Sequence, residues 1–137
     1  MTVISTIAGG FVGFFFTFAG FSKLTGAGPM GGEMQGGFLS GAWPAMWGLP
    51  TLPFLYAVGA AEAIIGPMVM AGAAGMLTTS SILASSAGAF ITFNATLSHV
   101  LKGDPVENVG FCATICSLFT IFSITKAMSL AGKIKLP

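Results

Sequence analysis

The chain consists mainly of long hydrophobic runs separated by short polar or glycine-rich segments. An α-helix needs about 20 apolar residues to cross a hydrocarbon core about 30 Å thick, because it rises about 1.5 Å per residue. Four runs are close to this length, at about 2–22, 55–76, 82–101 and 109–130. They predict an all-α membrane protein, a bundle of four transmembrane helices that forms a single domain over residues 1–137.

The composition agrees with this pattern. Hydrophobic residues make up 54% of the chain and charged residues only 7%, whereas about 25% of the residues in a soluble domain are charged. The five basic residues are all lysines, and the net charge is +1. Nucleic acid is excluded as a partner, because phosphate binding needs a clustered basic footprint.

The only long connector, residues 24–53, is rich in glycine and proline and holds both tryptophans. These residues oppose a regular spanning helix. Its apolar residues nevertheless form a stripe, with tryptophan at positions suited to a membrane interface. We therefore expect a short interfacial helix between the first two spans, with a stripe formed by Met34, Phe38, Leu39, Ala42, Trp43, Met46 and Trp47.

The remaining breaks predict short turns and the orientation of the spans. Residues 78–81 are predicted to form a polar hairpin, residues 102–105 to form a turn, and Pro67 to kink the second span. The first run lacks a basic start and is expected to be retained rather than cleaved. Lysine counting places both termini on the cytoplasmic or equivalent side, with Lys126 reaching out to the interface.

Glu62 is the strongest candidate for a functional group, because it is an ionisable residue inside a predicted span. Such a residue must face the bundle, pair with another group or stay protonated. It indicates either a site for a proton, cation or polar ligand, or a hydrogen-bonded carboxyl group that fixes helix packing.

His99 and Lys23 are predicted to lie in the same membrane leaflet as Glu62. Ser85, Thr92, Thr96 and His99 recur along one face of the third span. This face predicts either hydrogen bonds between helices or a polar pocket in which Glu62 and His99 bind a cofactor. No metal site is predicted, because one histidine and one acid fall short of the usual three or four ligands.

Small residues at helical spacing indicate close contacts between spans. The residues expected at such helix-packing positions are Gly9, Gly13, Gly66, Pro67, Cys112 and Cys116. The two cysteines are four residues apart, which does not match the spacing of a thioredoxin-like redox centre.

The order of these features resembles the DoxX-like family of small four-helix membrane proteins. The resemblance rests on Phe18-Ala19-Gly20-Phe21-Ser22-Lys23-Leu24 at the end of the first span, on Ala60-Ala61-Glu62-Ala63-Ile64-Ile65-Gly66 in the second, and on His99 near the end of the third. It implies a bundle with Lys23, Glu62 and His99 near a common pocket, and a link to quinone-associated sulfur oxidation or membrane oxidoreductase assemblies. The chain departs from the family in having Thr78-Thr79-Ser80 where an arginine is common.

No complete catalytic set is visible, so an enzyme is the less favoured expectation. We expect a small accessory subunit of a larger respiratory or photosynthetic membrane complex, packed against other integral subunits, lipids or pigments. The alternatives are a DoxX-type quinone-linked oxidoreductase component and a small oligomeric transporter. Quinone, chlorophyll or lipid are the ligands considered, in a bacterial inner membrane or a mitochondrial or plastid membrane.

Overall fold

A computed structural model describes residues 3–28, 31–32, 35–36 and 42–132. The helices with defined bounds in this part of the chain are α1 (Val3–Thr25), α3 (Ala42–Met46), α4 (Thr51–Ala73), α5 (Thr78–Lys102) and α6 (Val106–Ala131). The described residues contain no strand, which confirms the all-α prediction.

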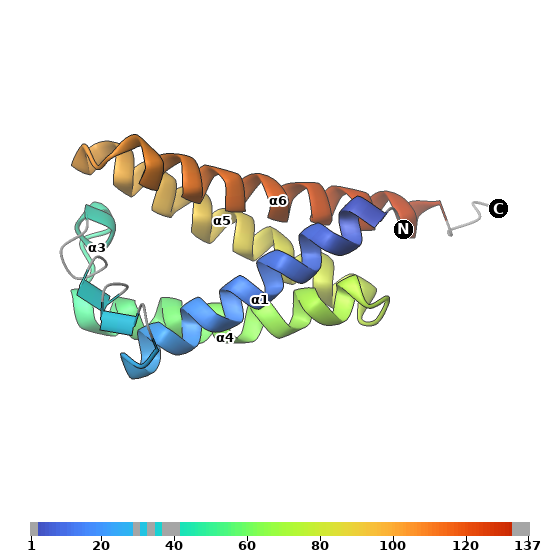
Figure 1. Ribbon diagram of the computed structural model, residues 1–137, viewed down its shortest axis with the longest axis horizontal. Helices are drawn as coiled ribbons and strands as arrows, with labels where there is room; N and C mark the ends of the chain where they lie inside the picture. The colour runs from blue at the N-terminus through green and yellow to red at the C-terminus, as the bar shows by residue number, and fades with distance from the viewer. Residues whose placement is uncertain (1–2, 29–30, 33–34, 37–41, 133–137) are drawn as a thin grey trace.

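The four long helices form two antiparallel hairpins (Figure 1). Helix α1 packs mainly against α4, and α5 packs mainly against α6; contacts of α4 with α5 and of α1 with α6 join the two hairpins. The start of α1, the α4–α5 turn and the end of α6 lie at one end of the bundle. The end of α1, helix α3 and the α5–α6 turn lie at the other end, which we call the connector end.

Three of the described helices, α1, α4 and α6, are long and apolar enough to cross a membrane. This finding indicates a membrane protein. Helix α5 is as long, with 25 residues, but is richer in serine and threonine than the other three.

The core of the bundle consists of aromatic rings packed against glycines. The rings of Phe16 and Phe119 meet edge to face, with centroids 4.5 Å apart. A Cβ atom on Gly9 would lie 2.5 Å from Cδ2 of Phe122, and one on Gly88 would lie 2.7 Å from Cε1 of Phe119. Glycine at these two positions therefore makes room for the rings.

Glycines also bring α1 and α4 into close contact. A Cβ atom on Gly66 would lie 2.5 Å from the carbonyl oxygen of Gly13, and one on Gly20 would lie 2.6 Å from that of Gly59. The two glycines of each helix are seven residues apart, or about two turns, so they lie on one face. Backbone thus meets backbone at two successive points of the antiparallel pair.

The turn between α4 and α5 differs from the prediction. Helix α4 ends at Ala73 because Gly75, with φ of +91°, closes it with bonds from Gly75 N–H to Gly72 O and from Met76 N–H to Ala71 O. Residues 78–81, predicted as a hairpin, instead form the first turn of α5. Their polarity is accommodated inside the helix, since the Ser81 hydroxyl donates to the carbonyl of Thr78.

The predicted interfacial stripe is corrected in part. In α3, Trp43 is buried and packs edge to face on Phe54, with centroids 5.5 Å apart. It belongs to a small core with Leu55 and Val58, while Trp47 is exposed. A five-residue helix is too short to lie independently on a surface, so it is held by this contact. Met34, Phe38 and Leu39 lie outside the described residues.

Two further predictions concern single residues. Helix α4 continues through Pro67, whose side chain is exposed rather than packed between helices.

Lys126 is buried instead of reaching outward, and its Nζ lies 5.7 Å from the centre of the Phe122 ring. Helical side chains lean toward the N-terminus of their helix, which carries the lysine over the preceding turn.

Candidate functional site

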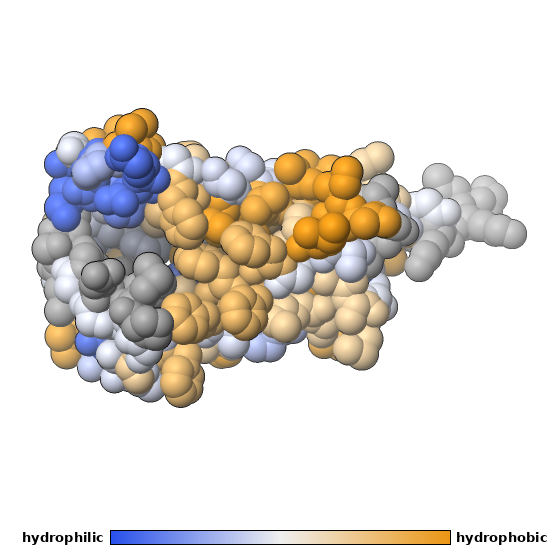
Figure 2. All heavy atoms as spheres, in the orientation of Figure 1, coloured by the Kyte–Doolittle hydropathy of each residue, from blue (hydrophilic) through white to orange (hydrophobic). Residues whose placement is uncertain are grey.

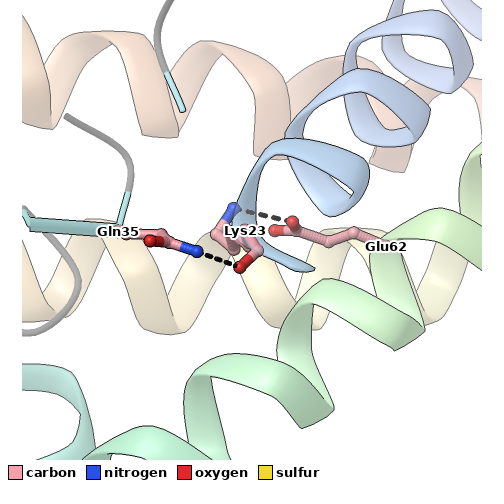
Figure 3. Close-up of polar contacts among 3 residues, drawn as sticks. All are labelled: Lys23, Gln35 and Glu62. Atoms are coloured by element: carbon pink, nitrogen blue, oxygen red, sulfur yellow. Dashed lines mark hydrogen bonds and ion pairs between the residues drawn. The ribbon is translucent and has the colours of Figure 1, made fainter. Parts of the chain in front are cut away.

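The most enclosed ion pair among the described residues joins Lys23 of α1 to Glu62 of α4. Nζ of Lys23 lies 2.6 Å from Oε2 of Glu62, and their side chains are only 12% and 6% exposed. Figure 3 shows the two side chains pointing toward each other from adjacent helices. The pair satisfies the requirement that a buried carboxylate find a partner.

The direction of the two helices explains why these side chains meet. Lys23 lies in the last turn of α1, and Glu62 lies eleven residues after the start of α4. Each side chain leans toward the N-terminus of its own helix. Because the helices are antiparallel, the lysine leans away from the connector end and the glutamate leans toward it.

The end of α1 is fixed by two further contacts. Gly26 has φ of +67°, and its N–H donates to the carbonyl of Ser22 at 2.8 Å, which is the αL form of a helix C-terminus. The Gln35 side-chain amide donates to the carbonyl of Lys23 at 2.8 Å (Figure 3). These bonds satisfy carbonyl groups that have no partner within a helix end, and they hold the turn that carries Lys23. Gln35 was not among the predicted site residues, because no local spacing in the sequence connects it to Lys23.

The ion pair has capacity for a polar ligand. An ammonium group has three N–H donors, and the described contacts of Lys23 Nζ use one of them. A carboxylate likewise has lone pairs beyond the one that accepts this bond. The pair is therefore suited to a ligand carbonyl, hydroxyl or headgroup, or to holding a proton.

The two cysteines lie in different surroundings. Cys112 of α6 is half-buried. The Cys116 thiol donates to the carbonyl of Ala89 in α5, with the two atoms 3.4 Å apart. Both thiols are free, and Cys116 links α5 with α6.

His99 forms a second polar cluster, at the end of α5. Its Nδ1 lies 2.7 Å from Oδ2 of Asp104, and Nζ of Lys102 lies 3.5 Å from Oδ1 of the same carboxylate. Since an ionised carboxylate only accepts hydrogen bonds, Nδ1–H is the donor. The bond from His99 and the charge of Lys102 lower the pKa of Asp104.

The α5–α6 turn is what brings Asp104 back over His99. Gly103 has φ of +72°, its N–H donates to Val100 O, and the Asp104 N–H donates to His99 O. These bonds make up a Schellman motif, which closes the helix and returns the chain over its last turn.

The structure does not bring the predicted pocket together as a unit. It joins Lys23 to Glu62, but among the described contacts His99 bonds to Asp104 and not to either of them. Thr92 Oγ1 donates to Gly88 O and Thr96 Oγ1 to Thr92 O, both at 2.8 Å. Both hydroxyl protons are thus used within α5, and the described bonds of these two side chains do not reach another helix.

Other hydroxyl pairs link the helices instead. Ser86 bonds to Ser123 at 2.9 Å, and Thr125 bonds to Ser5 at the same distance. The small size of these residues is the only sequence signal for such bonds, and it does not identify the partner.

Within the described ranges, no group of three or more histidine, cysteine, aspartate or glutamate residues could hold a metal ion.

No family model, curated protein or solved structure matches this chain.

Proposed function

We propose that the chain is a small accessory subunit of a larger membrane complex, with four membrane-spanning helices that pack against neighbouring subunits and lipids. The observation that carries this proposal is an inverted arrangement of α5: five of its polar residues are buried, and six of its large apolar residues are exposed. A helix on the surface of a soluble protein has the opposite arrangement.

The buried side of α5 holds Ser81, Ser85, Thr92, Asn94 and Ser98. Its exposed side carries Leu83, Phe90, Phe93, Leu97, Val100 and Leu101. Hydroxyl groups bonded to carbonyls of their own helix are tolerated inside a membrane, where backbone and side-chain polar groups must be satisfied internally. This arrangement favours α5 as the fourth span.

The outer surface supports lateral packing. Figure 2 shows hydrophobic residues over the body of the bundle and hydrophilic residues gathered at the connector end, where α5 turns into α6. A shallow groove of about 260 Å³ is lined by Ile4, Ile7, Ala8, Phe11 and Leu118. Such a surface suits contact with acyl chains, pigments or other helices.

The sequence favours a respiratory or photosynthetic complex as the partner. The test is native separation of membranes in mild detergent, followed by mass spectrometry of the band that contains the chain. Migration with a large redox or photosynthetic complex supports the proposal. Migration as a lone monomer contradicts it.

A second candidate is a quinone-linked oxidoreductase component of DoxX-like type, favoured by the donor and acceptor capacity of the Lys23–Glu62 pair. In that case Glu62→Gln abolishes quinone-dependent electron transfer while the chain still assembles in the membrane. Loss of assembly in parallel with activity would favour a structural role for the pair.

A further inference from the structure

Helix α6 is the least enclosed of the three candidate spans. Only 17% of the residues in its most apolar stretch are buried, compared with 44% in α1 and 39% in α4. Its outward face follows alternating spacings of three and four residues, and the exposed residues at these positions are Gly110, Thr114, Ser117, Ile121, Ile124 and Met128. This is the spacing by which one helix packs along another in a left-handed pair.

The first half of this face is flat because its side chains are small. A Cβ atom on Gly110 would meet nothing within 4 Å. The hydroxyls of Thr114 and Ser117 donate to carbonyls of α6 itself, at 2.8 and 2.9 Å, so their polarity is already satisfied. What remains is a strip on which another backbone can approach closely, as small residues allow between membrane helices.

The outward face of α1 has the opposite character. It presents large apolar side chains at Ile4, Ile7, Phe11, Phe14 and Phe21, which suit acyl chains. The two outward faces therefore differ in the neighbour that they favour, and α6 is the one shaped for a helix.

A charge at the connector end of the same face indicates the nature of that helix. Glu107 is exposed and lies three residues before Gly110, in the first turn of α6. Glu62 is paired with Lys23, and Asp104 with His99 and Lys102. Within the described ranges, Glu107 is the one acid without a hydrogen bond or ion pair.

We infer that the Glu107–Met128 face of α6 docks a transmembrane helix of a different protein, which carries a lysine or arginine at its end beside Glu107. A second copy of this chain fits poorly, because two-fold pairing on this face sets Glu107 against its own counterpart, and like charges repel. The inference rests on the proposed role as a subunit and adds the face and the charge of its neighbour.

The test places a photo-crosslinking amino acid at Ser117 of the full chain in its native membrane, with the same group at Phe14 of α1 as the control. The expected result is a cross-link from position 117, mapped by mass spectrometry to one transmembrane helix with a basic residue at the matching boundary. Position 14 gives no link to that helix. A link to a second copy, or no link from position 117 in an intact complex, overturns the inference.

Substitutions then test the contact itself. Gly110→Leu and Glu107→Lys are each expected to lower recovery of the complex at least about tenfold, and charge reversal of the partner's basic residue is expected to restore Glu107→Lys. Gly10→Leu is the matched control, because a Cβ on Gly10 of α1 also meets nothing within 4 Å. If Gly110→Leu leaves the recovery of the complex unchanged, the docking inference fails but the proposed function stands. If the wild-type chain migrates by itself, the proposed function fails as well.

Discussion

Gly20 of α1 faces Gly59 of α4, and each of these glycines precedes one member of the Lys23–Glu62 ion pair by three residues. A Cβ atom on Gly59 would lie 3.0 Å from Cβ of Lys23 and 3.2 Å from the carbonyl oxygen of Gly20. Residues three apart share a helix face. The two glycines therefore set the backbone separation at which the charged side chains can reach each other.

Alanine at position 20 is expected to destabilise the protein by about 1–3 kcal/mol, because the added methyl group would overlap backbone atoms that cannot move aside cheaply. Gly10→Ala is the control, since open space surrounds that position and alanine favours a helix interior over glycine by about 0.5–1 kcal/mol. Thermal unfolding in detergent measures the stability of the Gly20→Ala and Gly10→Ala variants. Equal melting temperatures for the two variants would contradict close packing at Gly20.

Removal of one member of the ion pair is expected to lower the stability of the protein more than removal of both members. Lys23→Met or Glu62→Leu alone leaves a buried group without its partner, at a cost of about 3–5 kcal/mol. The double variant should recover much of this loss. Lys102→Met removes a more exposed lysine, whose side chain is 34% accessible, and should cost about 0–1 kcal/mol. A thermal double-mutant cycle measures the coupling, and additive losses would show that the pair contributes no interaction energy.

The carboxylate of Asp104 is expected to make stability depend on pH in the acid range. Because the His99 hydrogen bond lowers its pKa below the ordinary value of 3.8, the stabilisation is present above pH 3.8 and disappears as pH falls through the lowered value. Asp104→Asn should remove this part of the acid dependence of the melting temperature. Glu107→Gln, which changes a nearby exposed acid, should leave it unchanged. If the melting temperature of Asp104→Asn fell with acid pH as steeply as that of the wild type, Asp104 would not be the source of this dependence.

The ion pair could be anticipated from the sequence only in part. A carboxylate within an apolar run requires a partner, and Lys23 was one of two basic groups predicted in its leaflet. The choice between Lys23 and His99 depends on the register of α1 against α4. That register is set by close backbone contacts at Gly13, Gly20, Gly59 and Gly66. Gly13 and Gly66 were predicted at helix-packing positions, but small residues do not identify the residue that each of them meets on another helix.

The turns show where polarity alone is a poor guide. Residues 78–81 were predicted as a hairpin because they are hydroxyl-bearing, but within a bundle such groups bond to their own helix and the break falls at Gly75 and Leu77, which have positive φ. His99 was assigned to a pocket by helical spacing. The Gly103 turn instead gives it a local partner, Asp104, five residues away.

Labelling of single cysteines tests whether α5 crosses the membrane. Leu49, Met76 and Val106 are exposed and lie before α4, after α4 and at the start of α6. Each is replaced by cysteine in a chain that lacks Cys112 and Cys116, and a membrane-impermeant maleimide is added to sealed vesicles of either orientation. Leu49→Cys and Met76→Cys should react from opposite sides, because α4 is long and apolar enough to span.

Val106→Cys then gives the decisive comparison. If α5 spans the membrane, this cysteine reacts from the same side as Leu49→Cys; if α5 does not, it reacts from the side of Met76→Cys. We expect the first result, since five polar residues of α5 are buried in the bundle and its exposed side chains are largely apolar. The lysine distribution further predicts that the side of Met76→Cys is the cytoplasmic or equivalent one. Reaction of all three cysteines from one side would contradict the bundle as a membrane-spanning unit.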